Sequence, residues 1–256
     1  MPDPRLSPFS RTFLTLAIVL IGVVPSLVFF FWIERNMSLP ILPVTLSFPW
    51  AHLEEMALPL KLVFDSALVL AFGAIHTALA QENIQKCYFS WIKPPAMRAF
   101  FMMVTGVSSF LMIAFWQNTG ILIWNLPLPQ PLGNMLSILL FWLILAVTLV
   151  IMSSHRALHF LGFEQLSKNH AESVESSTLI RSGFYRYVRH PIYTVTFLAV
   201  LAAPMMSLDR ALFLVMNGVY MIFAIPIEEK KLIRIFGQAY AEYRKQVPAL
   251  IPFTRF

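Results

Sequence analysis

The chain has 256 residues, of which 58% are hydrophobic and 12% are charged, and its net charge is +6. Such a composition is far more apolar than that of an ordinary soluble domain and indicates an integral membrane protein. Because no basic patch is interleaved with the aromatic residues of a nucleic-acid platform, we attribute the positive charge to membrane topology and to contact with anionic membrane lipid. Nucleic-acid binding is not expected.

Six apolar segments approach or exceed the roughly 18–20 residues that a helix needs to cross a bilayer. These segments are Thr12–Ile33, Leu58–Ala80, Ala99–Gln117, Met135–Ser153, Ile192–Leu208 and Ala211–Ile227. The first is longer than the core of a secretory signal and no small-residue cleavage site follows it, so we expect a retained anchor. Only Asp209 and Arg210 separate the last two, which predicts a tight helical hairpin. The expected fold is an all-α membrane protein with about six transmembrane helices.

The distribution of cations predicts the orientation of these helices. With six spans both termini lie on one side of the membrane, and that side holds all but three of the 19 lysines and arginines. The exceptions are Arg35, Lys61 and Arg210. The positive-inside rule therefore predicts that both termini are cytoplasmic.

We divide the chain into three parts. Residues 1–153 form an N-terminal region of four membrane helices, residues 154–182 a cytoplasmic loop, and residues 183–256 the hairpin and an amphipathic helix. In that last helix apolar residues recur every three or four positions and charged residues occupy the other face, which is typical of a helix at the membrane interface. Its apolar stripe consists of Leu232, Phe236, Ala239, Tyr240, Tyr243 and Val247.

The sequence GFYRYVRHPIYTVTF, residues 183–197, gathers cations directly before the fifth span. Pro191 suits the first turn of a helix, because its missing N–H costs nothing there. Arg189 and His190 would then stand beside unsatisfied N–H groups at the positive end of the helix dipole, an arrangement that binds anions. The alternative is that these cations contact lipid phosphates and enforce the topology.

Two carboxylates, Glu228 and Glu229, follow the sixth span. Carboxylates are costly near hydrocarbon, so a pair at this depth indicates a partner. Either the pair charges the N-terminus of the amphipathic helix, or it accepts hydrogen bonds from the hydroxyls or ammonium of a ligand. The predicted hairpin brings the pair to the depth of His190, and cations at one end with carboxylates at the other suit a zwitterionic ligand.

The remaining histidines and the single cysteine carry less information. His76 lies inside the second span, where an ionisable side chain is a functional candidate, although a neutral histidine hydrogen-bonded between helices is the commoner arrangement. His155 and His159 have the i, i+4 spacing of a metal-ligand pair, but the chain lacks the paired-histidine boxes of membrane di-iron enzymes, so no metal is expected. A lone cysteine, Cys87, excludes an internal disulfide.

SGFYRYVRHPIY, an apolar hairpin and then IEEKKLIRIFGQAYAEYRKQVPALIP resemble the C-terminal signature of the isoprenylcysteine carboxyl methyltransferase and phospholipid methyltransferase superfamily. The matching positions are Gly183, Tyr185, Arg189, His190, Pro191, Tyr193, Glu228, Glu229, Leu232, Phe236, Gly237, Tyr240, Tyr243, Val247, Pro248, Ile251 and Pro252. One departure is Val195, where the family has glycine. AIHTALA at residues 74–80 and HFLGFEQL at residues 159–166 resemble a bacterial branch that includes methanethiol S-methyltransferases.

The resemblance implies S-adenosylmethionine as the cofactor and a bacterial cytoplasmic membrane as the location. Arg189 and His190 would hold its carboxylate, and Glu228 or Glu229 its ribose hydroxyls or ammonium. Aromatic residues would pack on adenine or face the sulfonium, because aromatic faces attract cations. The cofactor-binding candidates are thus Tyr185, Arg189, His190, Pro191, Tyr193, Glu228, Glu229, Phe236 and Tyr240.

The candidate catalytic residues are Arg189 and His76, the latter to take a proton from a thiol. A small thiol is the first expectation for the methyl acceptor, followed by a prenylated cysteine carboxylate and a phospholipid amine. Two alternatives of another class remain: a nicotinamide-dependent sterol or lipid reductase, which shares a distantly similar R-H-P arrangement, and a non-catalytic membrane module in nitrogen-oxide metabolism.

Overall fold

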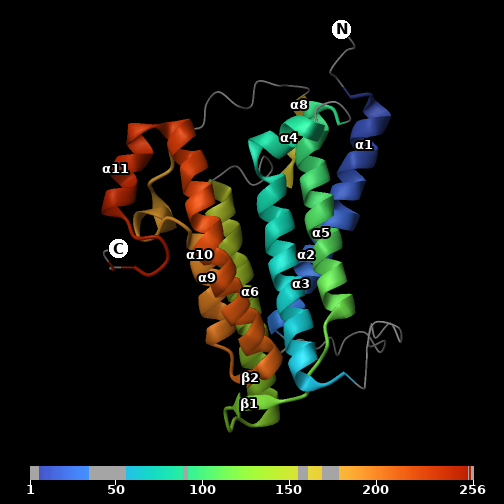
Figure 1. Cartoon of the computed structure of the whole chain (residues 1–256), viewed down its shortest axis with the longest axis vertical. Helices are drawn as coiled ribbons and strands as arrows, with labels where there is room; N and C mark the ends of the chain where they lie inside the picture. The colour runs from blue at the N-terminus through green and yellow to red at the C-terminus, as the bar shows by residue number, and fades with distance from the viewer. Residues whose placement is uncertain are drawn as a thin grey trace.

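The structure, a computed structural model, describes residues 6–34, 56–88, 92–154, 161–168, 179–252 and 254, and those residues are mostly helical (Figure 1). The long helices are α1 (Pro8–Ala17) and α2 (Val24–Glu34), joined by a π-helical segment (Ile18–Val23), then α3 (Leu58–Leu79), α5 (Met97–Phe115), α6 (Gln130–Ser154) and α10 (Leu208–Phe236). The short elements are α4 (Glu82–Tyr88), α8 (Phe163–Lys168), α9 (Pro191–Leu201), α11 (Gln238–Gln246), two 3-10 turns (Pro94–Ala96 and Gly183–Arg186) and the strands β1 (Leu122–Asn125) and β2 (Met205–Ser207).

Five helices in the described ranges are long and apolar enough to cross a membrane, which confirms an all-α, multi-pass membrane protein. They are Pro8–Ile33, Leu58–Leu79, Met97–Phe115, Pro131–Ile151 and Leu208–Phe236. Figure 1 shows the start of α1 and helix α11 toward one end of the bundle, and β1 and β2 at the opposite end.

The predicted fifth span, Ile192–Leu208, is wrong in form. Helix α9 ends at Leu201, and its 11 residues rise only about 16 Å, roughly half of the hydrocarbon core. Pro204 disfavours helical geometry at the residue before it, and the chain covers the remaining distance in extended form through β2, which pairs antiparallel with β1. Asp209 and Arg210 do not form the hairpin turn, because they lie in the first turn of α10.

The predicted boundary between the sixth span and the amphipathic helix is also wrong. Helix α10 continues through Pro226 to Phe236, so Glu228 and Glu229 lie inside it and charge no helix N-terminus. The break comes at Gly237, which has a φ of +57° that favours glycine. Helix α11 then folds back beside the end of α10, as Figure 1 shows.

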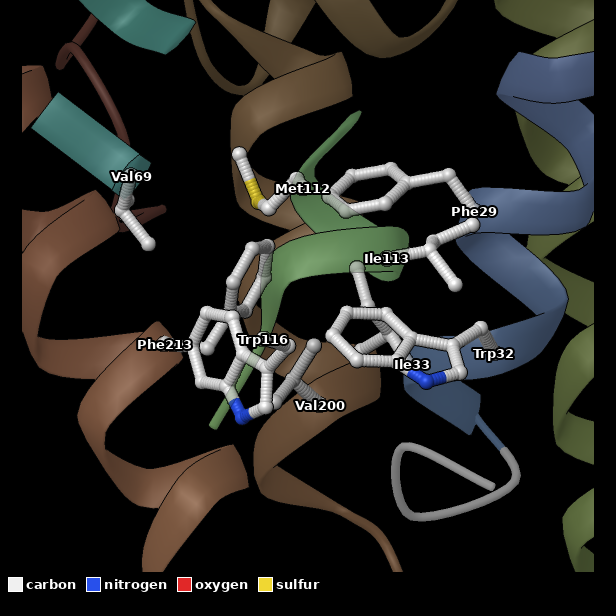
Figure 2. Close-up of a cluster of buried hydrophobic side chains, with 9 residues drawn as sticks. All are labelled: Phe29, Trp32, Ile33, Val69, Met112, Ile113, Trp116, Val200 and Phe213. Carbon is white, nitrogen blue, oxygen red and sulfur yellow. The ribbon is translucent and has the colours of Figure 1, made fainter. Parts of the chain in front are cut away.

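The main core lies where α2, α3, α5, α9 and α10 meet (Figure 2). Its buried side chains are Phe29, Trp32, Ile33, Val69, Met112, Ile113, Trp116, Val200 and Phe213. By contrast, large apolar side chains of α6 and α10 such as Trp142 and Phe223 are exposed, as expected of surfaces that face lipid.

Helix α5 approaches the π-helical segment very closely at Gly106. A Cβ atom at Gly106 would lie 1.9 Å from the carbonyl oxygen of Ile21 and 2.7 Å from the Cα of Gly22. Only a residue without a side chain fits there, and small residues let membrane helices pack backbone to backbone. This contact joins the first membrane helix to α5.

The loop after α5 is held by two buried carboxylates at the end of the bundle that carries β1 and β2. Asp209 accepts hydrogen bonds from Trp116 Nε1 at 3.2 Å, from the Thr119 N–H at 3.0 Å and from the Thr119 hydroxyl at 2.7 Å. Asp65 of α3 accepts one from the N–H of Gln117 at 3.0 Å. These bonds fix the start of α10 and therefore the position of its other end.

Candidate functional site

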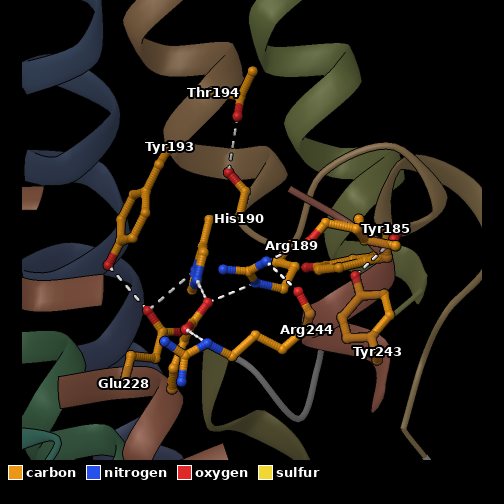
Figure 3. Close-up of polar contacts among 10 residues, drawn as sticks. Tyr185, Arg189, His190, Tyr193, Thr194, Glu228, Tyr243 and Arg244 are labelled. Atoms are coloured by element: carbon orange, nitrogen blue, oxygen red, sulfur yellow. Dashed lines mark hydrogen bonds and ion pairs between the residues drawn. The ribbon is translucent and has the colours of Figure 1, made fainter. Parts of the chain in front are cut away.

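A network of buried charges lies where α9 begins, close to the end of α10 (Figure 3). Glu229 is at its centre: Oε1 accepts a hydrogen bond from Arg189 Nε at 2.6 Å, and Oε2 pairs with Arg244 Nε at 2.9 Å. Nε2 of His190 lies 3.3 Å from the same Oε1. The side chain of Glu229 is only 3% exposed, so it is a buried carboxylate satisfied by three cationic partners.

His190 lies between the two carboxylates. Its Nδ1 is 3.5 Å from Glu228 Oε2, while its Nε2 faces Glu229. Burial disfavours the charged ring, but the hydrogen bonds to Glu228 and Glu229 outweigh it and raise the pKa of His190 above its ordinary 6.5. Tyr193 stacks on the imidazole at 5.6 Å and donates its hydroxyl proton to Glu228 Oε2 at 3.4 Å.

The two glutamates differ in exposure although they are neighbours in the chain. The side chain of Glu228 is 46% exposed, whereas that of Glu229 is 3% exposed. The known partners of Glu228, His190 and Tyr193, both bind one oxygen, Oε2. Glu228 is therefore the member of the pair that a ligand can reach.

Arg189 joins three segments of the chain. Besides its bond to Glu229, its Nη1 donates to the carbonyl oxygens of Arg244, at 3.0 Å, and Val247. Those carbonyls belong to the end of α11, where a cation stabilises the helix dipole and its unpaired acceptors. Arg189 thus fixes α11 against the start of α9 and the end of α10.

The C-terminal tail runs along the start of α9. The N–H groups of Arg189 and His190 donate to the carbonyls of Pro248 and Ala249 at 2.9 and 3.0 Å, and the Thr194 hydroxyl donates to Leu250 at 2.8 Å. Pro191 opens the helix as predicted. The structure corrects the sequence-based picture in one respect, because the cations and carboxylates bind one another instead of lying at opposite ends of a ligand.

Aromatic side chains line the neighbouring surface of α11. Tyr240 and Tyr243 are buried with their rings 5.7 Å apart, and Tyr243 donates to the carbonyl of Tyr185 at 2.6 Å. Burial raises the pKa of Tyr243 to about 12 and raises that of Tyr240 as well, so both phenols are neutral. The buried hydroxyl of Tyr240 has no hydrogen-bond partner among the described residues and is available to a ligand. Phe236, the last residue of α10, is half-buried.

His76 lies apart from this network, between α3 and α5. Its Nδ1 is 3.4 Å from the Thr105 hydroxyl, and its ring lies 6.0 Å from that of Phe72 and 4.7 Å from that of Phe101. This geometry matches a histidine held between membrane helices. The histidines at 155 and 159 lie outside the described residues.

Two connections tie the end of α3 to α10. The hydroxyls of Thr77 and Tyr220 are 2.7 Å apart, and the Lys231 ammonium donates to the carbonyl of Ala80 at 3.0 Å. The ring of Tyr220 also lies against Gly73, where a Cβ atom would come within 2.4 Å of it. These contacts place the helix that carries His76 beside the helix that carries the glutamates.

Sequence reasoning missed Arg244 and the tail carbonyls as parts of the site. Arg244 belongs to the charged face of the predicted amphipathic helix, and its contact with Glu229 exists only because α11 folds back at Gly237. The signal that was present in the sequence is the Phe-Gly pair at 236–237, since glycine commonly ends a helix. Neither the turn angle nor the direction of α11 follows from that signal.

Comparison with known proteins shows which class of protein the chain resembles. Residues 132–239 match the phospholipid methyltransferase family. The chain is 29% identical to a methanethiol S-methyltransferase of Crocosphaera subtropica over 204 residues, covering 78% of each chain. It is 28% identical to one of Mycobacterium tuberculosis over 198 residues, covering 75% of this chain and 78% of the relative.

A more distant similarity covers only part of the chain. It is 36% identical to a protein-S-isoprenylcysteine O-methyltransferase of Schizosaccharomyces pombe over 77 residues, which cover 29% of this chain and 33% of the relative. No solved structure matches the chain. Among the three classes expected from the sequence, these relatives support the methyltransferase. Residues 132–239 are therefore similar to the phospholipid methyltransferase family, in a chain that is a multi-pass membrane methyltransferase.

Proposed function

We propose that this protein transfers the methyl group of S-adenosylmethionine to a small thiol such as methanethiol, producing a thioether. The observation that carries the proposal is the ion network of Arg189, His190, Glu228 and Glu229 inside the family domain, with an exposed carboxylate beside aromatic rings. The relatives named methanethiol S-methyltransferase that match along about three quarters of this chain support the thiol as acceptor.

The residues present fit S-adenosylmethionine, which carries a sulfonium, an ammonium and a carboxylate. Glu228 offers a reachable carboxylate for the ribose hydroxyls or the ammonium, and the half-buried Tyr193 offers an aromatic face for adenine or the sulfonium. The buried Tyr240 hydroxyl supplies a further hydrogen-bonding group. We assign Glu229 and Arg189 to positioning, because each is already bound within the protein, and Tyr185, His190, Pro191 and Phe236 to the surrounding cofactor site.

When bound, the cofactor would supply a methyl group activated by its sulfonium for transfer to the acceptor sulfur, with the demethylated thioether as the leaving group. The protein has to align the acceptor with that group and keep water away. A thiolate and a sulfonium neutralise each other in the transition state, so a dry site among apolar helices favours the reaction. His76, half-buried beside Thr105, is our candidate for taking the thiol proton.

We assign the acceptor and the cofactor to different parts of the helical bundle. Helices up to residue 153 would shape the acceptor side, and residues 183–256 would hold the cofactor at the end of the bundle where α11 lies. We propose that this end faces the bacterial cytoplasm, since the first-matched relatives are bacterial and the positive-inside rule predicts cytoplasmic termini. An apolar thiol could then enter from the bilayer.

A second candidate is methylation of a prenylated cysteine carboxylate, because the similarity to isoprenylcysteine methyltransferase has the higher identity, 36%, over its shorter range. The test is transfer of labelled methyl from S-adenosylmethionine to methanethiol, farnesylcysteine or phosphatidylethanolamine by the protein in detergent. We expect the thiol to be the best acceptor. Preference for farnesylcysteine would favour the second candidate, and no transfer to any of the three would contradict both.

Cofactor binding is tested separately with Glu228→Gln, and with Glu242→Gln on the exposed face of α11 as the control. We expect Glu228→Gln to weaken S-adenosylmethionine binding about tenfold, as for one lost charge-assisted hydrogen bond, and Glu242→Gln to leave it unchanged. Equal binding by wild type and Glu228→Gln would remove Glu228 from the cofactor site.

A further inference from the structure

A cavity of about 510 Å³ opens beside the ion network, between the end of α10 and α11. It is lined by Arg189, Ile233, Ala241, Arg244 and Lys245. Three of these five residues are cations and the other two are small or branched apolar residues. None of the cofactor-binding aromatic residues proposed above lines this cavity, and Arg189 alone belongs to both surroundings.

The charge of the cavity is positive overall. Glu229 is the carboxylate bound to its cations, and that one negative charge is shared by Arg189 and Arg244. The terminal carbonyls of α11 could also have offset the positive charge, but those of Arg244 and Val247 accept hydrogen bonds from Arg189. Lys245 is exposed and adds a further positive charge at the rim.

This charge selects the chemical class of the ligand. The methyl donor has a sulfonium and an ammonium against a single carboxylate, so a positive cavity repels it, and the exposed carboxylate of Glu228 suits it better. A phosphate group suits the cavity, because guanidinium groups bind phosphate oxygens with matched geometry and an ammonium adds a point charge. The apolar wall of Ile233 and Ala241 suits the ester part of such a molecule.

We propose that this cavity is an anion site for a phosphate group, carried by an anionic phospholipid or by a soluble phosphate compound. The position of the cavity favours the lipid. It lies against Ile233, near the end of a helix long enough to cross the membrane, where headgroups are found. The phosphate would sit between Arg244 and Lys245, with the ester on the apolar wall.

The test is calorimetric titration of the full-length protein in a phosphate-free detergent with short-chain phosphatidylglycerol, short-chain phosphatidylcholine and inorganic phosphate. Lys245→Gln removes the rim charge, and Ala241→Phe fills the cavity. Arg234→Gln is the matched control, because Arg234 is an exposed cation of α10 that does not line the cavity. Binding of S-adenosylmethionine by the same samples shows separately whether each variant is folded and whether the donor site is intact.

We expect phosphatidylglycerol to bind more tightly than phosphatidylcholine, with Lys245→Gln weakening it roughly fivefold, as for one exposed ion pair. Ala241→Phe should abolish binding and Arg234→Gln should leave it unchanged. The same pattern with inorganic phosphate alone would support the site and identify a soluble ligand. Failure of both anions to bind, or an equal loss in Arg234→Gln, would overturn the proposal even where the methyl donor binds normally.

Discussion

Neutralising Glu228 and neutralising Glu229 should affect two different properties of the protein, cofactor binding and stability. Glu229→Gln keeps the size of the side chain but removes the charge that Arg189 and Arg244 share. Arg189 is itself buried, so its guanidinium would lose its counter-ion where water solvates it only in part. Breaking a buried ion pair from one side costs about 3–5 kcal/mol of stability.

The same change at Glu228 should be mild. Its side chain is 46% exposed, and its contacts with His190 and Tyr193 are 3.4–3.5 Å long. Exposed ion pairs contribute about 0–1 kcal/mol. Glu228→Gln should therefore fold normally and lose cofactor binding, whereas Glu229→Gln should lose stability.

The assay is thermal unfolding in detergent, with binding of S-adenosylmethionine measured well below the unfolding temperature. A loss of about 3–5 kcal/mol corresponds to a decrease in Tm on the order of 10 °C for a chain of this size. Equal unfolding temperatures of the two variants, or a lower one for Glu228→Gln, would contradict both expectations. Either result would mean that burial does not separate the roles of the two carboxylates.

Three further results are expected. The pKa of His190 is raised in the folded protein, so the stability that its protonation contributes is complete below pH 6.5 and is lost as the pH rises through the raised pKa. The unfolding temperature should therefore decrease above pH 6.5, and His190→Gln should abolish this decrease. Gly106→Ala places a Cβ 1.9 Å from the carbonyl oxygen of Ile21 and should cost about 1–3 kcal/mol of stability or more. The control Gly218→Ala, whose Cβ would have its nearest atom at 3.8 Å, should be neutral or stabilising. Equal unfolding temperatures of the two variants would contradict the close contact at Gly106. Thr194→Val removes the hydroxyl that donates to the carbonyl of Leu250 in the C-terminal tail at 2.8 Å, which should cost about 1 kcal/mol of stability. Limited proteolysis should then cut the tail faster. An unchanged cleavage rate would show that the backbone hydrogen bonds alone hold the tail.

The different roles of neighbouring residues change how the family signature is understood in this protein. Arg189 and Glu229 fit the description of a positioning pair, since they join α9, α10 and α11. Glu228, Tyr193 and Tyr240 are the members of the signature that a ligand can meet or pair with. Loss of methyl transfer in an Arg189 variant would therefore have to be compared with its stability before Arg189 is given a role in the chemistry.

Local chemistry in the sequence was sufficient for the membrane character, the long apolar helices and the grouping of the charged motif with the glutamate pair. Each depends on short-range properties: the length of an apolar run, the preference of Pro191 for a first turn, and the high cost of a carboxylate near hydrocarbon. The predicted fifth span is wrong in form, but the expected proximity of His190 to Glu228 and Glu229 is present in the structure.

Other features depend on contacts between distant segments, which short-range pattern does not specify. Helix α9 is short because the chain after it pairs with β1, where Ser207 lies opposite Leu122, some eighty residues earlier in the sequence. Which glutamate is buried depends on the fold-back at Gly237 that carries Arg244 to Glu229. Apolar periodicity identifies the helices, but the direction in which α11 returns, and with it the ion network and the cavity, follows from packing and charge pairing in the folded chain.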